Sequence, residues 1–200
     1  MANHYFSENP ETAHQFENWR FTLLGHEFQF TTDSGVFSRN TVDYGSRVLL
    51  EAFDWQELPD GTLLDVGCGY GPIGLALSKA SGKTVEMVDI NQRAVELAEK
   101  NAATNQLNNV DIHTSNIYET LHQTSYAAII SNPPIRAGKK VVHEILSAAE
   151  PLLKTGGTLT IVIQKKQGAP SAEKKMAEVF GNVEIVTKDK GYYILKSYKE

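Results

Sequence analysis

From residue 60 onward, short apolar runs alternate regularly with amphipathic segments, and this feature constrains the fold most. The apolar runs are rich in β-branched residues, which predicts strands that are buried on both faces. Between these runs, apolar residues recur at helical spacing. The alternation predicts an α/β fold with a largely parallel, doubly wound sheet and right-handed crossovers. We expect strands at 62–66, 84–88, 110–114, 127–131 and 158–163, and helices at 72–80, 91–104, 139–153 and 173–180.

Both ends of the chain depart from this alternation. Two β-rich runs near the N-terminus, 19–24 and 27–31, flank Gly25-His26 and predict a hairpin. Two further runs, 183–187 and 192–197, predict an antiparallel hairpin that adds to the sheet. A helix is expected at about 41–53 with Thr41 as its N-cap. We expect one domain over residues 1–200, in which an arm, the first hairpin and this helix (1–55) precede a core at 56–200.

Composition excludes several classes of protein. No run of about 18 apolar residues is present, so no transmembrane span is expected. The first residues lack the basic start and apolar stretch of a signal peptide. The single cysteine, Cys68, excludes an intrachain disulfide and a cysteine-cluster metal site. A reducing cytoplasm is therefore the expected compartment. The oligomeric state is open, since no coiled-coil pattern or unusually apolar surface stretch stands out, and a monomer is favoured.

The net charge of −5 is distributed unevenly along the chain. Residues 1–130 hold 7 Lys/Arg and 17 Asp/Glu, a net of −10, whereas residues 131–200 hold 12 and 7, a net of +5. A solvated helix face explains some of the later lysines. The sharper interpretation is a polyanionic partner, because phosphate attraction supplies most sequence-independent affinity for nucleic acid. The candidate RNA-binding residues are Arg136, Lys139, Lys140, Lys165 and Lys166.

A glycine-rich corner follows the first expected core strand, in the run Leu64-Asp65-Val66-Gly67-Cys68-Gly69-Tyr70-Gly71-Pro72. Glycines allow a sharp turn and close approach to a ligand, and open α/β sheets bind ligands at the carboxyl ends of their strands. The window 69–74 also fits the pattern G-x-G-x-x-G, so a nicotinamide cofactor is one alternative. The acidic Asp65 favours a ligand with an ammonium group over a pyrophosphate, unless it is a satisfied turn carboxylate.

Polar residues also end the next two strands. A carboxylate at Asp89 suits two neighbouring ribose hydroxyls, although it can instead cap the following helix. An amide at Ser115-Asn116 can pair with an adenine edge, and a plain turn is the alternative.

The fourth core strand ends in the run Ile129-Ile130-Ser131-Asn132-Pro133-Pro134-Ile135. The prolines lack N–H groups and cannot continue a central strand, and each restricts the residue before it. The result is a rigid corner that offers one side-chain amide and unused backbone carbonyl groups.

These motifs, in this order, resemble class I S-adenosylmethionine (SAM)-dependent methyltransferases. More narrowly, the chain resembles the RsmC-like family of small-subunit (16S) ribosomal RNA guanine-N2 methyltransferases, in a short single-domain form. The matches include the runs 34–38, 42–46 and 66–74. The resemblance implies a seven-stranded Rossmann-like sheet, SAM as cofactor, no metal, and ribosomal RNA or the small subunit as partner. It implies catalytic roles for Asn132, Pro133, Pro134 and Ile135, and cofactor contacts from Phe37, Asp65, Gly67, Cys68, Gly69, Gly71, Asp89, Ile90, Ser115 and Asn116.

The resemblance also implies a mechanism. The exocyclic amine of a purine is a poor nucleophile because its lone pair is delocalised into the ring. Hydrogen bonds from its two N–H groups to Asn132 Oδ1 and the Pro133 carbonyl favour a pyramidal nitrogen aimed at the methyl group. His143 is expected to be a surface residue rather than a base.

Two departures from the family matter. Longer members carry an extra N-terminal domain, for which these 200 residues leave no room. Many members also have Phe after Asn-Pro-Pro, where this chain has Ile135 and can offer only apolar contact. Base recognition must therefore depend on other residues, with Phe37 as the candidate.

Alternative functions remain open from the sequence. They are methylation of adenine in transfer RNA or DNA, methylation of a protein glutamine, a nicotinamide-dependent oxidoreductase, and a non-catalytic RNA-binding module.

Overall fold

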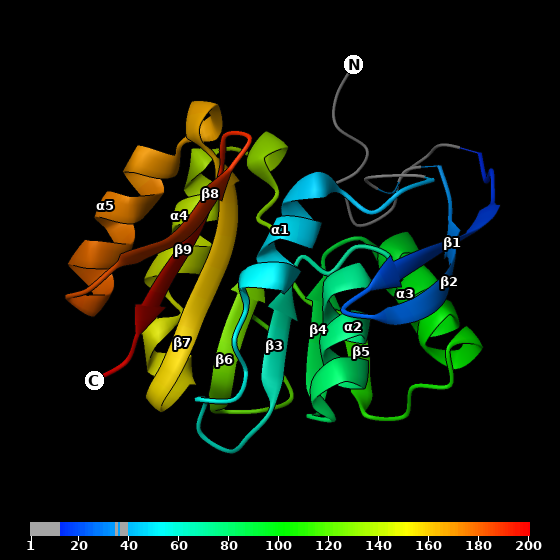
Figure 1. Ribbon diagram of the computed structural model, residues 1–200, viewed down its shortest axis with the longest axis horizontal. Coiled ribbons are helices and arrows are strands. Elements are labelled where there is room, and N and C mark those ends of the chain that lie inside the picture. Colours follow the sequence, from blue (N-terminus) through cyan, green and yellow to red (C-terminus); the bar gives the residue numbers. More distant parts are fainter. Residues whose placement is uncertain (1–12, 35, 37–39) are drawn as a thin grey trace.

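The computed structural model describes residues 13–34, 36 and 40–200. Within these residues, helices flank a seven-stranded sheet with the order β5-β4-β3-β6-β7-β9-β8, and β1 and β2 form a separate hairpin (Figure 1). The strands are β1 (Glu17–Leu23), β2 (His26–Thr32), β3 (Leu63–Val66), β4 (Val85–Asp89), β5 (Val110–Thr114), β6 (Tyr126–Ser131), β7 (Leu153–Gln164), β8 (Glu184–Asp189) and β9 (Tyr192–Tyr198). The helices are α1 (Tyr44–Ala52), α2 (Pro72–Ser81), α3 (Gln92–Thr104), α4 (Lys139–Ser147) and α5 (Ala169–Phe180).

The strand directions confirm the predicted fold class. Strands β3 to β7 pair in parallel, while β9 pairs antiparallel with both β7 and β8. The order reverses at β3, where β4 continues on one side and β6 on the other. Ligands of open α/β sheets bind at such a switch point.

Different helices cover the two faces of the sheet. The helices α1, α2 and α3, together with the hairpin, pack against one face, and α4 and α5 pack against the other (Figure 1). Successive side chains of a strand point to opposite faces, so the neighbours Leu63 and Leu64 belong to separate cores although both are fully buried. This explains the continuous apolar runs in the sequence.

The N-terminal hairpin is joined to the core by side-chain amides. Asn101 of α3 accepts from the Thr31 N–H at 2.8 Å and donates to the Thr31 carbonyl at 3.1 Å. Asn105, one turn later, makes the same pair with the backbone of Gln29. These bonds satisfy groups along β2 that would otherwise form an open edge. The turn itself is Leu24-Gly25, with φ of 50° and 78°, rather than the predicted Gly25-His26.

The predicted helix at 139–153 is wrong in its second half. Helix α4 ends at Ser147, a short 3-10 turn covers Glu150–Leu152, and β7 begins at Leu153. Pro151 has no N–H for a helical bond and its ring would clash with the preceding turn. The strand then runs through Gly157, where a side chain would meet the Lys154 carbonyl oxygen at 2.8 Å.

Helix α1 begins later than predicted. Its N-cap is Asp43, whose carboxylate accepts from the Ser46 N–H at 3.1 Å, and Thr41 lies outside the helix. Aspartate is one of the residues preferred at an N-cap, because its side chain accepts a hydrogen bond from an N–H group that has no partner within the helix. No helix among the described residues is long and apolar enough to cross a membrane.

Candidate functional site

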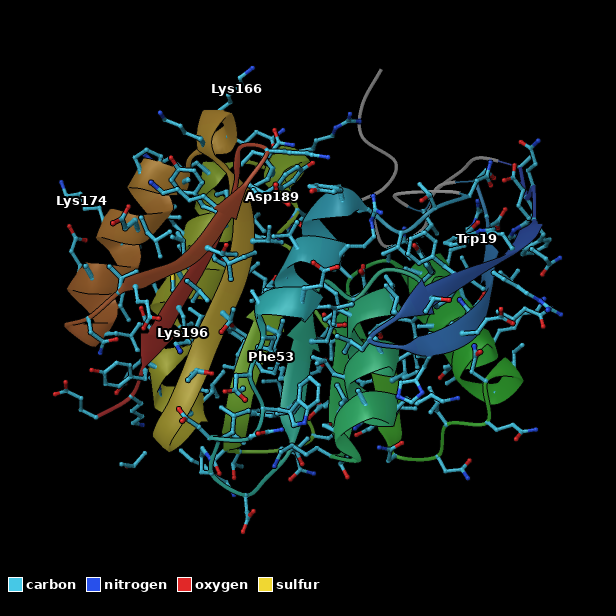
Figure 2. The ribbon with its side chains drawn as sticks, in the orientation of Figure 1. Trp19, Phe53, Lys166, Lys174, Asp189 and Lys196 are labelled. Atoms are coloured by element: carbon cyan, nitrogen blue, oxygen red, sulfur yellow. The ribbon has the colours of Figure 1, made fainter. Side chains whose placement is uncertain are left out.

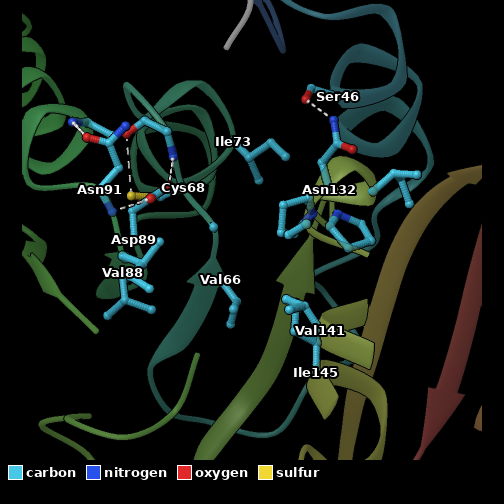
Figure 3. Close-up of a pocket in the computed structure, with 18 of the residues that line it drawn as sticks. Ser46, Val66, Cys68, Ile73, Val88, Asp89, Asn91, Asn132, Val141 and Ile145 are labelled. Atoms are coloured by element: carbon cyan, nitrogen blue, oxygen red, sulfur yellow. Dashed lines mark hydrogen bonds between the residues drawn. The ribbon is translucent and has the colours of Figure 1, made fainter. Parts of the chain in front are cut away.

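A cavity of about 390 Å³ opens at the carboxyl ends of β3, β4 and β6 (Figure 3). Both corners singled out in the sequence line it, although they are 65 residues apart in the chain. The floor is apolar and includes Val66, Val88, Val141 and Ile145. The volume falls in the range of small-molecule and cofactor sites.

The glycine corner turns back beneath the cavity. Gly67, Gly69 and Gly71 have φ of 72°, 58° and 105°, a region that residues with a Cβ rarely adopt. The N–H groups of Gly67 and Cys68 both donate to the Val88 carbonyl at 2.9 Å, which fixes the corner to β4. Burial raises the pKa of the Cys68 thiol well above its ordinary value, so Cys68 serves as a small apolar wall.

The Asp89 carboxylate lies at the far end of β4 and lines the cavity. Its two oxygens accept from the Gly69 and Asn91 N–H groups, each at 2.9 Å. Burial raises its pKa above the ordinary value, while these hydrogen bonds act in the opposite direction. The helix α3 is capped by Asn91 rather than Asp89, so the Asp89 carboxylate is not needed as a helix cap. Ile90 beside it also lines the cavity.

Two predicted cofactor residues do not line the cavity. Asp65 is 1% exposed and turns beneath the corner, where one oxygen accepts from the Gly74 N–H at 2.9 Å. Asp65 thus lies outside the cavity lining although a contact with a ligand ammonium was predicted for it, because β3 points this side chain towards α2. Burial raises its pKa to about 7. Gly71 is the N-cap of α2 and also lies outside the lining.

Ser115 and Asn116 line the cavity where β5 ends. The Ser115 hydroxyl donates to the Ile117 carbonyl at 2.9 Å and accepts from the Thr120 N–H at 3.2 Å, so it shapes the loop. The Asn116 amide donates to Glu119 at 3.2 Å, and none of the residues that the structure describes donates to its oxygen.

The Asn132 amide is held from the opposite side by α1. Its nitrogen donates to Asp43 Oδ2 at 2.9 Å and to Ser46 Oγ at 3.0 Å (Figure 3 shows the second bond). A carboxylate only accepts, so the amide nitrogen must face Asp43 and the amide oxygen must face away. Within the described part of the chain, Asn132 Oδ1 has no hydrogen-bond partner.

The prolines keep backbone acceptors available beside this amide. The Pro134 carbonyl accepts from the Ala137 N–H at 2.9 Å, within a 3-10 turn that begins at Ile135. By contrast, no described residue donates to the Pro133 carbonyl. Pro133, Pro134 and Ile135 all line the cavity, which therefore offers two acceptors close together on a stiff support.

Other lining residues carry no clear signal in the sequence. Asp43 is the N-cap of α1 and Ser46 lies in its first turn, Gln164 ends β7 and Gln167 lies in the turn after it, and Tyr192 begins β9. Asp43 belongs to the run 42–46, which matches the family, and this match is a signal in the sequence that could have identified it as a site residue. Phe37, the predicted base-recognition residue, lies outside the described residues.

The five predicted RNA-binding residues lie around the same edge of the sheet. Lys139 and Lys140 are exposed at the start of α4, and Lys165 and Lys166 are exposed where β7 ends (Figure 2 shows Lys166 at the upper edge). Arg136 lines the cavity. His143 is half-buried rather than on the surface, because its ring faces α5 and shares a hydrogen bond with Ser171 at 3.0 Å.

A second polar cluster lies away from the cavity. Glu86, Asp111, His113 and His122 bring their ligand-type atoms within 4.8 Å of one another. The two imidazole rings stack at 3.6 Å, and each has a carboxylate oxygen at 2.7 Å. The hydrogen bonds from His113 to Glu86 and from His122 to Asp111 thus explain why these four side chains lie close together.

The doubly wound sheet, the glycine corner with an acid after the next strand, and the Asn-Pro-Pro corner together define a class I SAM-dependent methyltransferase. The methyltransferase small domain family matches residues 27–196, and the chain belongs to this family. Its cofactor is SAM. The cavity fits this cofactor in its chemistry, since the Asp89 carboxylate and the backbone of Gly67 and Gly69 line it.

Individual relatives agree with this assignment. The uncharacterized protein YbxB of Bacillus subtilis is 50% identical over 100% of both chains. The ribosomal RNA small subunit methyltransferase C of Aeromonas hydrophila is 39% identical over 76% of this chain and 46% of its own length. The solved structure of the T. thermophilus 16S rRNA methyltransferase RsmC, in complex with AdoMet and guanosine, has a TM-score of 0.83 at 27% identity and covers 92% of this chain and 51% of its own. The chain thus spans about half the length of the RsmC relatives.

Proposed function

We propose that this protein transfers a methyl group from SAM to the exocyclic amine of a guanine in small-subunit ribosomal RNA, in the cytoplasm. The observation that supports the proposal best is the Asn132 amide, which Asp43 and Ser46 at the start of α1 orient so that its oxygen is available at the cavity. Family membership and the guanosine complex of RsmC support the acceptor.

The cofactor would lie over the glycine corner. We assign the ribose hydroxyls to Asp89, the adenine edge to Ser115 and Asn116, and the remaining contacts to Gly67, Cys68, Gly69 and Ile90, all of which line the cavity. Bound SAM supplies a methyl group on a positively charged sulfonium. The carboxylates of Asp43 and Asp89 line the same cavity and favour a cation there.

The acceptor amine would lie against the Asn-Pro-Pro corner. Asn132 Oδ1 and the Pro133 carbonyl each accept one of its N–H groups, which withdraws the nitrogen from conjugation and directs its lone pair at the methyl group. The bond from the methyl group to sulfur breaks as the bond to nitrogen forms, which leaves S-adenosylhomocysteine, and the proton that the methylated nitrogen then loses passes to water. Neither acceptor therefore has to titrate. Because both are already oriented in the folded protein, little reorganisation is needed when the reactants meet.

The RNA would cross the basic edge of the sheet. Lys139, Lys140, Lys165 and Lys166 are exposed there and Arg136 lines the cavity. Attraction to phosphates at this edge brings the strand to the site without reading its sequence.

The test offers labelled SAM to the protein with naked ribosomal RNA, intact small subunits, transfer RNA and a release factor, and then maps the methylated atom. Label on guanine N2 of the small-subunit RNA supports the proposal. Label on adenine or on a glutamine side chain selects one of the other amine or amide substrates and refutes the guanine assignment.

Two variants separate chemistry from cofactor binding. Asn132→Ala should lower the rate of methyl transfer roughly 100-fold, as for loss of a catalytic hydrogen bond, with little change in SAM affinity. Asp89→Ala should weaken SAM binding itself. Asn108→Ala is the matched control, because Asn108 is exposed and remote from the cavity. An Asn132→Ala protein that methylates at the wild-type rate would contradict the mechanism.

A further inference from the structure

The chain has an unusual pair of residues at the cavity beside Asn132. Asp43 is the N-cap of α1, and one of its oxygens, Oδ2, holds both the Ser46 N–H and the Asn132 amide. The other oxygen, Oδ1, has no hydrogen-bond partner among the described residues. Asp43 is only half-buried and lines the cavity. One carboxylate thus orients Asn132 with one oxygen and leaves the other for a ligand.

An aromatic ring lies next to this carboxylate. Tyr192 lines the cavity from the start of β9, where it pairs with Gln164 at the end of β7. Gly45 permits its position, because a Cβ on Gly45 would lie 2.9 Å from the Tyr192 ring and 3.0 Å from Asp43 Oδ2. The Tyr44 ring supports it from the side, with centroids 5.6 Å apart. The ring is therefore held at the same edge of the cavity as Asp43.

We propose that Asp43 and Tyr192 form the subsite for the acceptor base, in which Asp43 Oδ1 accepts the N1–H of guanine and Tyr192 stacks on the purine ring. This deepens the proposed function and rests on it for the reaction. Guanine carries N1–H directly beside its exocyclic amine, whereas adenine has an unprotonated N1 there. A carboxylate adjacent to Asn132 therefore attracts the N1–H of guanine and repels the lone pair on N1 of adenine.

Tyr192 also resolves the question raised by Ile135. The aromatic residue that many family members place after Asn-Pro-Pro is absent, and Ile135 cannot stack. The chain brings an aromatic ring to the cavity from β9 instead, two strands away from β6. Base–aromatic stacking contributes substantially to binding and tolerates any base, so it complements the selective contact from Asp43.

The test measures nucleoside binding to the protein saturated with S-adenosylhomocysteine, separately from methyl transfer. The two probes are guanosine and 2-aminopurine riboside. Both carry the 2-amino group, but 2-aminopurine has an unprotonated N1. Wild-type protein should prefer guanosine by roughly 10- to 100-fold, the range for one well-placed polar contact to a base.

Three variants divide the roles. In Asp43→Asn, the side-chain oxygen can still accept from Asn132 and Ser46, but an NH₂ group replaces the free oxygen, so the preference should vanish or reverse. Tyr192→Leu should weaken both nucleosides roughly 10-fold without changing their ratio. Tyr193→Leu is the matched control, because Tyr193 packs against the opposite core and does not line the cavity.

Each outcome has a clear meaning. An unchanged guanosine preference in Asp43→Asn, or undiminished affinity in Tyr192→Leu, overturns the subsite, and so does a wild-type protein that binds no guanosine at millimolar concentration. If the subsite behaves as expected but no ribosomal RNA is methylated, the proposed function fails and the base-binding subsite stands.

Discussion

Replacing Asp65 by Asn should remove much of the pH dependence of this protein's stability. The carboxyl group is 1% exposed, and only one of its oxygens has a hydrogen-bond donor, the Gly74 N–H. Burial raises its pKa from 3.8 to about 7, the Gly74 hydrogen bond opposes the shift, and the nearby Asp89 charge adds to it. The folded state therefore retains a proton that the unfolded chain releases.

The direction follows from this difference. Since the folded pKa is above the unfolded value, the cost of ionising Asp65 is absent below about pH 4, grows as the pH rises, and is complete above about pH 7. A shift of about three units corresponds to about 4 kcal/mol of unfolding free energy in total. Roughly 2.5 kcal/mol of this falls between pH 5 and pH 8.

Urea unfolding without cofactor, at constant ionic strength, measures the effect at pH 5 and pH 8. Wild-type protein should lose more stability between these values than Asp65→Asn, by roughly 2.5 kcal/mol. The comparison cancels any constant cost of the new amide. Glu57→Gln, on an exposed side chain, is the control for a change of charge alone. Parallel changes in wild type and Asp65→Asn would show that the buried carboxyl is not the cause.

Two further predictions concern the strand β7 and the basic edge. Gly157→Ala should lower the free energy of unfolding by about 1–3 kcal/mol, because the new Cβ would lie 2.8 and 2.9 Å from two backbone carbonyl oxygens that cannot move aside. Thermal unfolding measures this loss, and an unchanged melting temperature would refute the prediction. Replacing Lys165 and Lys166 together by Gln should weaken RNA binding and reduce the slope of log affinity against log salt concentration by about 2. The control Lys79→Gln should change neither quantity, because Lys79 is exposed in the last turn of α2, at the end of the helix far from the cavity. An identical salt dependence in both proteins would place the RNA elsewhere.

The sequence predicts local structure best at residues that restrict or extend the conformations of the backbone. Strand–helix alternation predicted the parallel sheet, and prolines and glycines predicted both corners, because these residues restrict or extend the backbone irrespective of their surroundings. The same rules, applied more strictly, would have ended the helix before Pro151. Asn91 and Pro72 mark the starts of their helices for equally local reasons.

What the sequence by itself determined is therefore the order of the elements, the two stiff corners and the family. Only the tertiary structure decided which side chains meet. Asp65 and Asp89 look alike in the sequence, yet Asp65 lies within β3 on the face that packs against α2 and is buried, whereas Asp89 ends β4 and lines the cavity. Asp43 and Tyr192 are about 150 residues apart and come together because β9 returns beside β7 and α1 crosses its end. Such contacts depend on how strands and helices are packed, and no local pattern encodes that.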